Sequence, residues 1–199
     1  MGNRILAIGS VIAATFLAVQ PISASNPEPA GASHFSVTHP ILAASIERLS
    51  AESASWREAM RAVAVTGRKT VIVTPEDVTG FDTHLLAQAL ALADEHSRVD
   101  TVLVVVNLPL LQRLSGLPVE AVQFKDDLDR IIAHEVFGHA VPYLLAGHLA
   151  GECSDPVEGQ RVTDACAIKR ENQIRKELGL GRRLEYGRAS LTFARRHER

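Results

Sequence analysis

Two histidines spaced five residues apart constrain this chain more than any other feature. The apolar stretch Ile131–Ala140 reads IIAHEVFGHA, so His134 and His139 occupy positions i and i+5. An α-helix turns about 100° per residue, so a regular helix would point these side chains about 140° apart. Pro142 has no N–H for the carbonyl of Gly138, and its ring collides with that carbonyl. We therefore expect a π-bulge or break centred on Gly138, which brings both histidines to one face.

With such a bulge, the stretch becomes a variant of HExxH, the helical motif whose two histidines bind zinc. The sequence predicts Zn²⁺ held by His134 and His139, with a water molecule in the open fourth position. Glu135 would take a proton from this zinc-bound water as general base while a peptide bond is hydrolysed. His148, beyond the proline, is the alternative partner for His134. The competing interpretation is that His134 and Glu135 are ordinary polar residues on an amphipathic helix.

A third zinc ligand is expected on the next helix. Asp164 is the first candidate, because a carboxylate near the start of that helix can reach back over the metal helix. Glu171, seven residues further on, lies on the same helix face and is the reserve candidate. Asp164 could instead be a negative charge stabilised by the helix macrodipole.

The motif residues resemble known zinc peptidases. HEVFGH is similar to the HExxGH motif of the dipeptidyl peptidase III family, although 199 residues are too few for that large two-lobed enzyme. A broader resemblance is to compact zincin-like effector and toxin peptidases of bacteria. Their metal helix is followed by a helix reading roughly EExxAxxxENxIRxELGLPxRxxY, which residues 164–186 match with Asp164 for Glu and Gly181 for Pro. The resemblance implies a small zincin-like fold and a peptide or protein substrate.

The hydrophobic pattern predicts an α+β domain over 46–199, with helices around a short sheet and a bent metal-binding helix. We expect strands at 70–74 and 101–106, the second buried on both faces. Helices are expected at 50–65, 82–96, 122–145 and 163–178, the last ended by Gly179. Residues 26–45 are rich in Pro, Ala and Ser and are expected to form a linker or short pro-segment.

The first 25 residues have the pattern of a secretory signal peptide. Arg4 precedes an apolar core, and small residues end at Ser25, where we expect cleavage. An uncleaved membrane anchor is the alternative, but the core is short for a span. The expected location is therefore secreted or periplasmic. In such an oxidising compartment, Cys153 and Cys166 are predicted to form a disulfide bond.

Charge and composition narrow the function classes. With 46% hydrophobic residues and a net charge of -2, the composition excludes a disordered chain. From Lys169 onward, ten Lys and Arg residues face four Asp and Glu. Aromatic residues are few there, so we favour a solvated helix face over binding to nucleic acid or an anionic membrane. No stable membrane span is expected after signal cleavage.

The resulting prediction is an exported zinc metallopeptidase that acts on a peptide or protein substrate. One alternative is a non-catalytic exported protein, such as a degenerate peptidase, in which zinc only stabilises a binding module. A fourth protein ligand would indicate that alternative, because it would displace the water. A secreted interaction protein without metal is the other alternative, and a straight helix with diverging histidines would indicate it.

Overall fold

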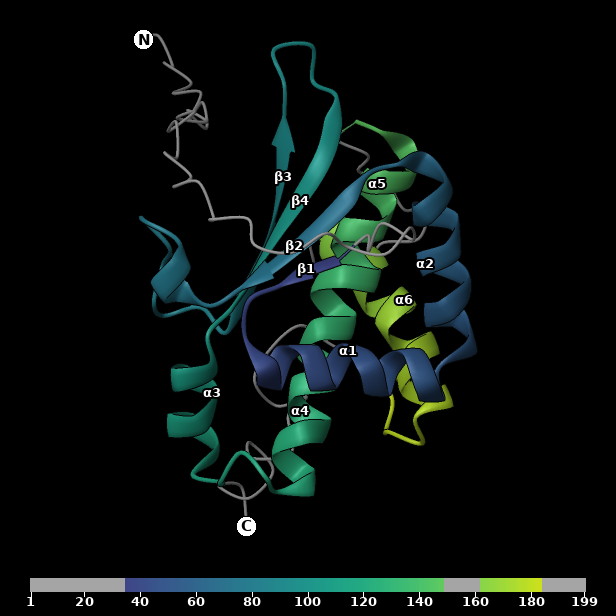
Figure 1. Cartoon of the computed structure of the whole chain (residues 1–199). Coiled ribbons are helices and arrows are strands. Elements are labelled where there is room, and N and C mark those ends of the chain that lie inside the picture. Colours follow the sequence, from purple (N-terminus) through teal and green to yellow (C-terminus); the bar gives the residue numbers. More distant parts are fainter. Residues whose placement is uncertain (1–34, 149–161, 184–199) are drawn as a thin grey trace, which may run out of the picture. The chain divides into compact units, whose positions relative to one another are not determined.

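The computed structural model describes residues 35–148 and 162–183, which form an α+β domain as predicted (Figure 1). Its sheet has the strand order β1-β2-β4-β3. β1, β2 and β4 are parallel neighbours, and β3 runs antiparallel to β4 at the edge. The strands are β1 (Phe35–Val37), β2 (Lys69–Val73), β3 (Ala87–Ala93) and β4 (Val99–Val106).

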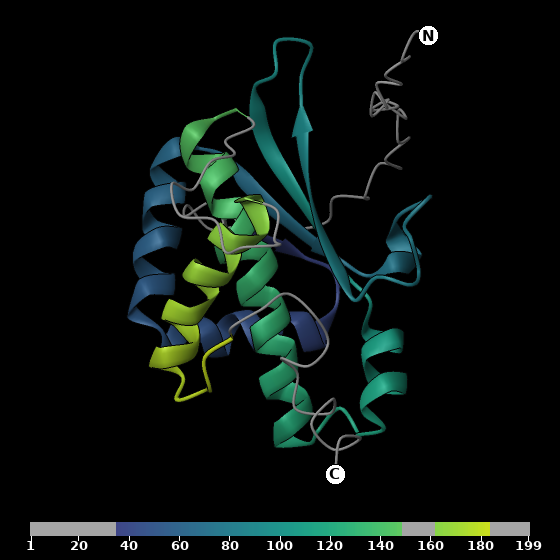
Figure 2. The same cartoon turned by 180° about the vertical axis from the view of Figure 1, so that it is seen from behind.

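The helices that surround the candidate site lie on one side of this sheet, as Figure 2 shows from behind. α4, the π-helical segment η2 and α5 follow one another without interruption, and α6 packs along η2. The segments are α1 (Pro40–Glu52), α2 (Ala54–Thr66), the short 3₁₀ turn η1 (Pro75–Asp77), α3 (Leu108–Ser115), α4 (Val122–Ile132), η2 (Ala133–Ala140), α5 (Val141–Ala146) and α6 (Val162–Glu177).

The apolar run that predicted a buried strand forms the centre of the sheet. β4 lies between β2 and β3, and Val104, Val105 and Val106 are all fully buried. Three consecutive buried residues need cover on both faces, because successive side chains of a strand point to opposite sides. The predicted strand is therefore buried on both faces from Val104 to Val106, whereas Thr101 and Leu103 are only partly buried. Gly179 also ends α6 as predicted, with a φ of 67°.

The predicted linker contains part of the fold. β1 and the first turns of α1 lie between Phe35 and Ser45, so the domain boundary expected at residue 46 comes too late. The proline content of residues 26–45 favoured a linker, but proline is also common in the first turn of a helix, and Pro40 lies in the first turn of α1. His39 caps that turn, since its Nδ1 accepts the Ile41 N–H at 3.2 Å.

The helix predicted over 82–96 is wrong, since this segment contains β3. The Ala- and Leu-rich sequence has high helix propensity, but pairing with β4 overrides it. Asp94 stabilises the hairpin turn by accepting the backbone N–H groups of His96 and Arg98. At the other end, the Asn107 amide donates to the carbonyls of Thr83 and Leu85. The contacts of Asn107 join residues more than twenty positions apart, so no local periodicity in the sequence could predict them.

The proposed signal peptide and Cys153 lie outside the described residues. Cys166 is buried on α6, and its disulfide bond with Cys153 remains a prediction. None of the described helices has both the length and the apolar character needed to cross a membrane.

Candidate metal centre

The helix that carries the motif has the extra residue expected from the histidine spacing. Residues 133–140 form a π-helix between α4 and α5, and the Val141 N–H donates to the carbonyl of Val136, five residues earlier. The carbonyl of Gly138, which Pro142 leaves without its helical donor, accepts a hydrogen bond from Arg170 on α6 at 3.1 Å. The predicted π-bulge is thus confirmed, and a neighbouring helix satisfies the polar group that it exposes.

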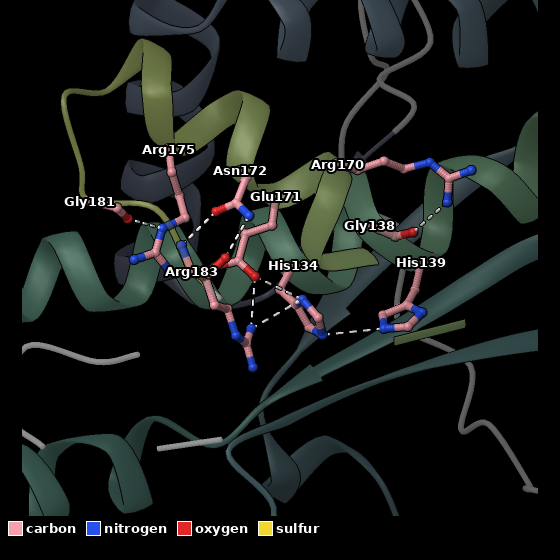
Figure 3. A network of polar contacts seen from close by, with 9 residues as sticks. All are labelled: His134, Gly138, His139, Arg170, Glu171, Asn172, Arg175, Gly181 and Arg183. Atoms are coloured by element: carbon pink, nitrogen blue, oxygen red, sulfur yellow. Dashed lines mark hydrogen bonds and ion pairs between the residues drawn. The ribbon is translucent and has the colours of Figure 1, made fainter. Parts of the chain in front are cut away.

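The bulge brings the two histidines together (Figure 3). The Nε2 atoms of His134 and His139 lie 3.3 Å apart, and their rings are nearly perpendicular at 85°. Two nitrogens bound to one tetrahedral zinc at about 2.1 Å would lie about 3.4 Å apart. The spacing of these nitrogens therefore fits one metal ion. The two histidines do not diverge from a straight helix, which is the arrangement expected for the alternative without metal.

Glu171 on α6 contacts the Nδ1 side of the His134 ring. Its Oε2 lies 3.0 Å from His134 Nδ1, and both side chains are buried. A carboxylate accepts hydrogen bonds, so we assign the His134 proton to Nδ1, which leaves the Nε2 lone pair facing His139. This carboxylate–histidine pair has the arrangement by which proteins orient metal-binding histidines.

Two arginines in turn hold Glu171. Arg175 Nη1 lies 2.7 Å from its Oε1, and Arg183 Nη1 lies 2.8 Å from its Oε2. Burial alone would raise the pKa of Glu171, but hydrogen bonds from His134 and Arg175 and the charges of Arg183 and His134 lower it to about 2. Glu171 is therefore ionised at neutral pH and keeps its acceptor role.

The chain after α6 folds back to place Arg183 at the site. Asn172 forms a pair of hydrogen bonds with the backbone of Arg183, at 2.8 Å to its carbonyl and 2.7 Å from its N–H. Arg175 Nε donates to the Gly181 carbonyl at 2.6 Å. Figure 3 shows how these bonds direct the Arg183 guanidinium toward Glu171 and His134.

His139 differs from His134 in being only partly buried. Burial lowers the pKa of His139 to about 4, and the charges of His134, Arg170 and Arg183 act in the same direction. The ring is thus neutral at pH 7, which is the protonation state that a metal ligand requires.

Glu135 lies between the helix and the edge strand of the sheet. Its side chain is almost completely buried, and the segment η2 that carries it packs against β3. Burial raises the pKa of Glu135 above its ordinary value. A carboxylate with a raised pKa beside a pair of facing imidazoles is suited to proton transfer.

Gly138 is required by the close approach of α6. A Cβ built on it would lie 2.9 Å from Ala167 Cβ and 3.0 Å from Ala167 Cα. We expected glycine here because it tolerates a distorted backbone, but the structure shows that packing against α6 also needs it. The small pair of Gly138 and Ala167 lets α6 approach η2 closely enough for Glu171 to reach His134.

The remaining candidate ligands are placed differently. Asp164 is in the first turn of α6, two turns before Glu171, but its side chain lies outside the described residues. His148 is exposed beyond the end of α5, and its Nδ1 lies 3.0 Å from the Ala146 carbonyl. Within the described parts of the chain, no three His, Cys, Asp or Glu side chains are arranged to hold a metal ion.

Sequence reasoning assigned no role to the arginines at this site. Arg170, Arg175 and Arg183 all belong to the basic C-terminal region, which we interpreted as a solvated helix face. One available signal was the i, i+4 spacing of Glu171 and Arg175, which places opposite charges side by side on a helix. The role of Arg183 depends on the turn after α6, which has no such signal.

The chain matches no model of a protein family, no curated protein and no solved structure.

Proposed function

We propose that this protein is a zinc-dependent peptidase whose metal ligands are His134, His139 and a carboxylate at the start of α6. The observation that carries the proposal is the 3.3 Å separation of the two Nε2 atoms, produced by a π-helix that brings two residues five positions apart to one face. Bulges of this kind are rare and concentrate at functional sites. Two imidazoles and a carboxylate are a donor set that suits zinc.

Asp164 is the proposed third ligand, and Glu171 is better suited to orient His134 than to bind the metal. The Glu171 carboxylate contacts Nδ1 of His134, the nitrogen on the side of the ring opposite Nε2. It is also held by two arginines, which compete for its oxygens. Asp164 is two helical turns earlier on α6, and we propose that its carboxylate completes the ligand set.

Zinc at this site would lower the pKa of a water molecule and polarise the carbonyl of a peptide bond. Glu135 would accept a proton from the attacking water and deliver it to the amine nitrogen of the departing peptide. The raised pKa of Glu135 favours this shuttle, because the carboxyl group must hold the proton between the two steps. The edge strand β3, which packs against η2, would present backbone groups along which an extended peptide can lie.

The test separates the roles of base and ligand. The purified full chain should contain about one zinc per molecule by mass spectrometry and should hydrolyse a denatured protein substrate. Glu135→Gln should abolish hydrolysis yet retain zinc, whereas His139→Ala should lose both. His148→Ala is the matched control and should retain both. Wild-type protein that takes up no zinc, or equal zinc loss in the Glu135 and His139 variants, would refute the proposal.

A further inference from the structure

The chain reverses direction after α6, and the return segment, residues 178–183, lies back along the helix. Gly179 has a φ of 67°, and the Leu180 N–H donates to the Arg175 carbonyl at 2.7 Å, as in a Schellman motif. Arg175 Nε in turn donates to the Gly181 carbonyl at 2.6 Å. These bonds fix the start of the return segment against the last turns of α6.

Asn172 fixes the other end of the return segment. Its amide nitrogen donates to the Arg183 carbonyl at 2.8 Å, and its Oδ1 accepts the Arg183 N–H at 2.7 Å. One carboxamide thus pairs with both backbone groups of a single residue, because it carries a donor and an acceptor in one plane. Two bonds of this kind set the orientation of the Arg183 backbone and therefore the direction in which its side chain leaves the chain.

The Arg183 side chain leads from this anchor to the candidate metal centre (Figure 3). Its Nη1 lies 2.8 Å from Glu171 Oε2, the same oxygen that lies 3.0 Å from His134 Nδ1. Arg175 Nη1 contacts the other oxygen, Oε1, at 2.7 Å. The carboxylate is thus bound at both oxygens, and it cannot rotate without losing an ion pair. Arg183 therefore keeps Oε2 at the Nδ1 side of the histidine.

We propose that Asn172 is a positioning residue of the metal centre, which acts on His134 through Arg183 and Glu171. This step rests on the function proposed above, because it takes His134 as a metal ligand. A ligand that binds through Nε2 must keep its proton on Nδ1, and a fixed carboxylate acceptor holds it there. When Arg183 is displaced, Oε2 is held less firmly, and the proton can move to the nitrogen that the metal needs.

Competition with a zinc chelator, using the full chain, measures the effect on metal affinity. Asn172→Ala and Arg183→Met should each lower zinc affinity about tenfold. The neighbouring residues provide matched controls with the same changes of side chain. Gln173 donates to Ser55 on α2, and Arg182 is exposed, so Gln173→Ala and Arg182→Met should change zinc affinity less than about twofold.

The double variant Asn172→Ala/Arg183→Met tests whether the two residues act in sequence. If Asn172 acts through Arg183, the double variant should bind zinc about as tightly as either single variant does. Two independent effects would multiply to about 100-fold.

The tautomer of His134 in the metal-free protein gives a second readout, measured by ¹⁵N NMR of the imidazole nitrogens. The proton should reside on Nδ1 in the wild type and in Gln173→Ala. In Asn172→Ala and Arg183→Met it should be distributed between Nδ1 and Nε2. A substitution that only made the fold less stable would leave the tautomer of the folded molecules unchanged.

Three results would overturn this inference: unchanged zinc affinity in Asn172→Ala and Arg183→Met, multiplied losses in the double variant, or an unchanged tautomer in both single variants. A wild type that takes up no zinc would refute the proposed function, and the tautomer of His134 would then decide whether Asn172 positions the ring. A wild type that binds zinc and hydrolyses its substrate, with both single variants equal to it, would refute only the positioning role.

Discussion

Two carboxylates on neighbouring helices are buried to the same degree but titrate in opposite directions. Glu171 on α6 and Asp129 on α4 are each 1% exposed. The pKa of Glu171 is lowered to about 2, whereas the pKa of Asp129 is raised to about 6. Burial opposes ionisation of both groups, so their partners decide the difference.

Glu171 has three donors, and Asp129 has fewer and weaker ones. Burial is the largest influence on Asp129, opposed by a hydrogen bond from Ser45 and by Arg48, whose Nε lies 3.1 Å away. Arg48 is partly exposed and is shared with Asp126, which itself raises the pKa of Asp129. The comparison shows that a buried carboxylate stays charged only when enough donors surround it. Glu171, next to the proposed metal centre, meets this condition.

The largest expected effect is the removal of a buried arginine from the Glu171 cluster. Arg175→Met should lower the free energy of unfolding by about 3–5 kcal/mol, because it leaves a buried carboxylate short of a cation. Arg48→Met should cost about 1 kcal/mol, because Arg48 is 27% exposed and water can replace it. Urea unfolding of both variants measures this difference. Equal losses of stability would show that the surroundings of Glu171 and Asp129 do not differ in the way that the pKa values of the two carboxylates indicate.

A smaller effect is expected on metal affinity. Glu171→Gln keeps an acceptor near His134 but removes its charge, so zinc affinity should fall about 10- to 100-fold. Glu177→Gln is the matched control on the same helix, because Glu177 contacts serines and neither histidine. Competition with a zinc chelator measures both affinities. An unchanged zinc affinity in Glu171→Gln would show that Glu171 does not orient His134 for metal binding.

The smallest effect concerns the dependence of stability on pH. The raised pKa of Asp129 means that the folded state holds its proton up to about pH 6, whereas the unfolded state loses it near 3.8. This group therefore favours unfolding increasingly as pH rises from about 4 to about 6, by roughly 2 kcal/mol in total. Glu171 acts in the opposite direction, and its stabilising contribution is lost only as pH falls from about 4.5 toward 2.

The variant Asp129→Asn isolates the first of these effects. Between pH 4.5 and 7, it should lose less stability than the wild type does, by about 1–2 kcal/mol in urea unfolding. Asp100→Asn makes the same substitution at a side chain that is 79% exposed and serves as the control. If the stability of wild type and Asp129→Asn changed with pH in parallel, the folded protein would ionise Asp129 with little loss of stability.

The sequence alone determined the local structure of the helix that carries His134 and His139. The spacing of His134 and His139, together with Pro142, required an extra residue in the turn, and the π-helix is there. Helix α6 and strands β2 and β4 were also predictable, because their periodicity and β-branched runs are local signals. These features depend on backbone geometry over a few residues, which neighbouring side chains specify directly.

Tertiary structure decided which residues surround that helix. The Ala- and Leu-rich segment of β3 became a strand because β4 offered it backbone partners, although its composition favours a helix. Glu171 became the partner of His134 Nδ1, and Arg170 came to satisfy the Gly138 carbonyl, because α6 packs closely on η2. The two hydrogen bonds of α6 with η2 join residues more than thirty positions apart, and their energy depends on how two elements dock rather than on any local pattern.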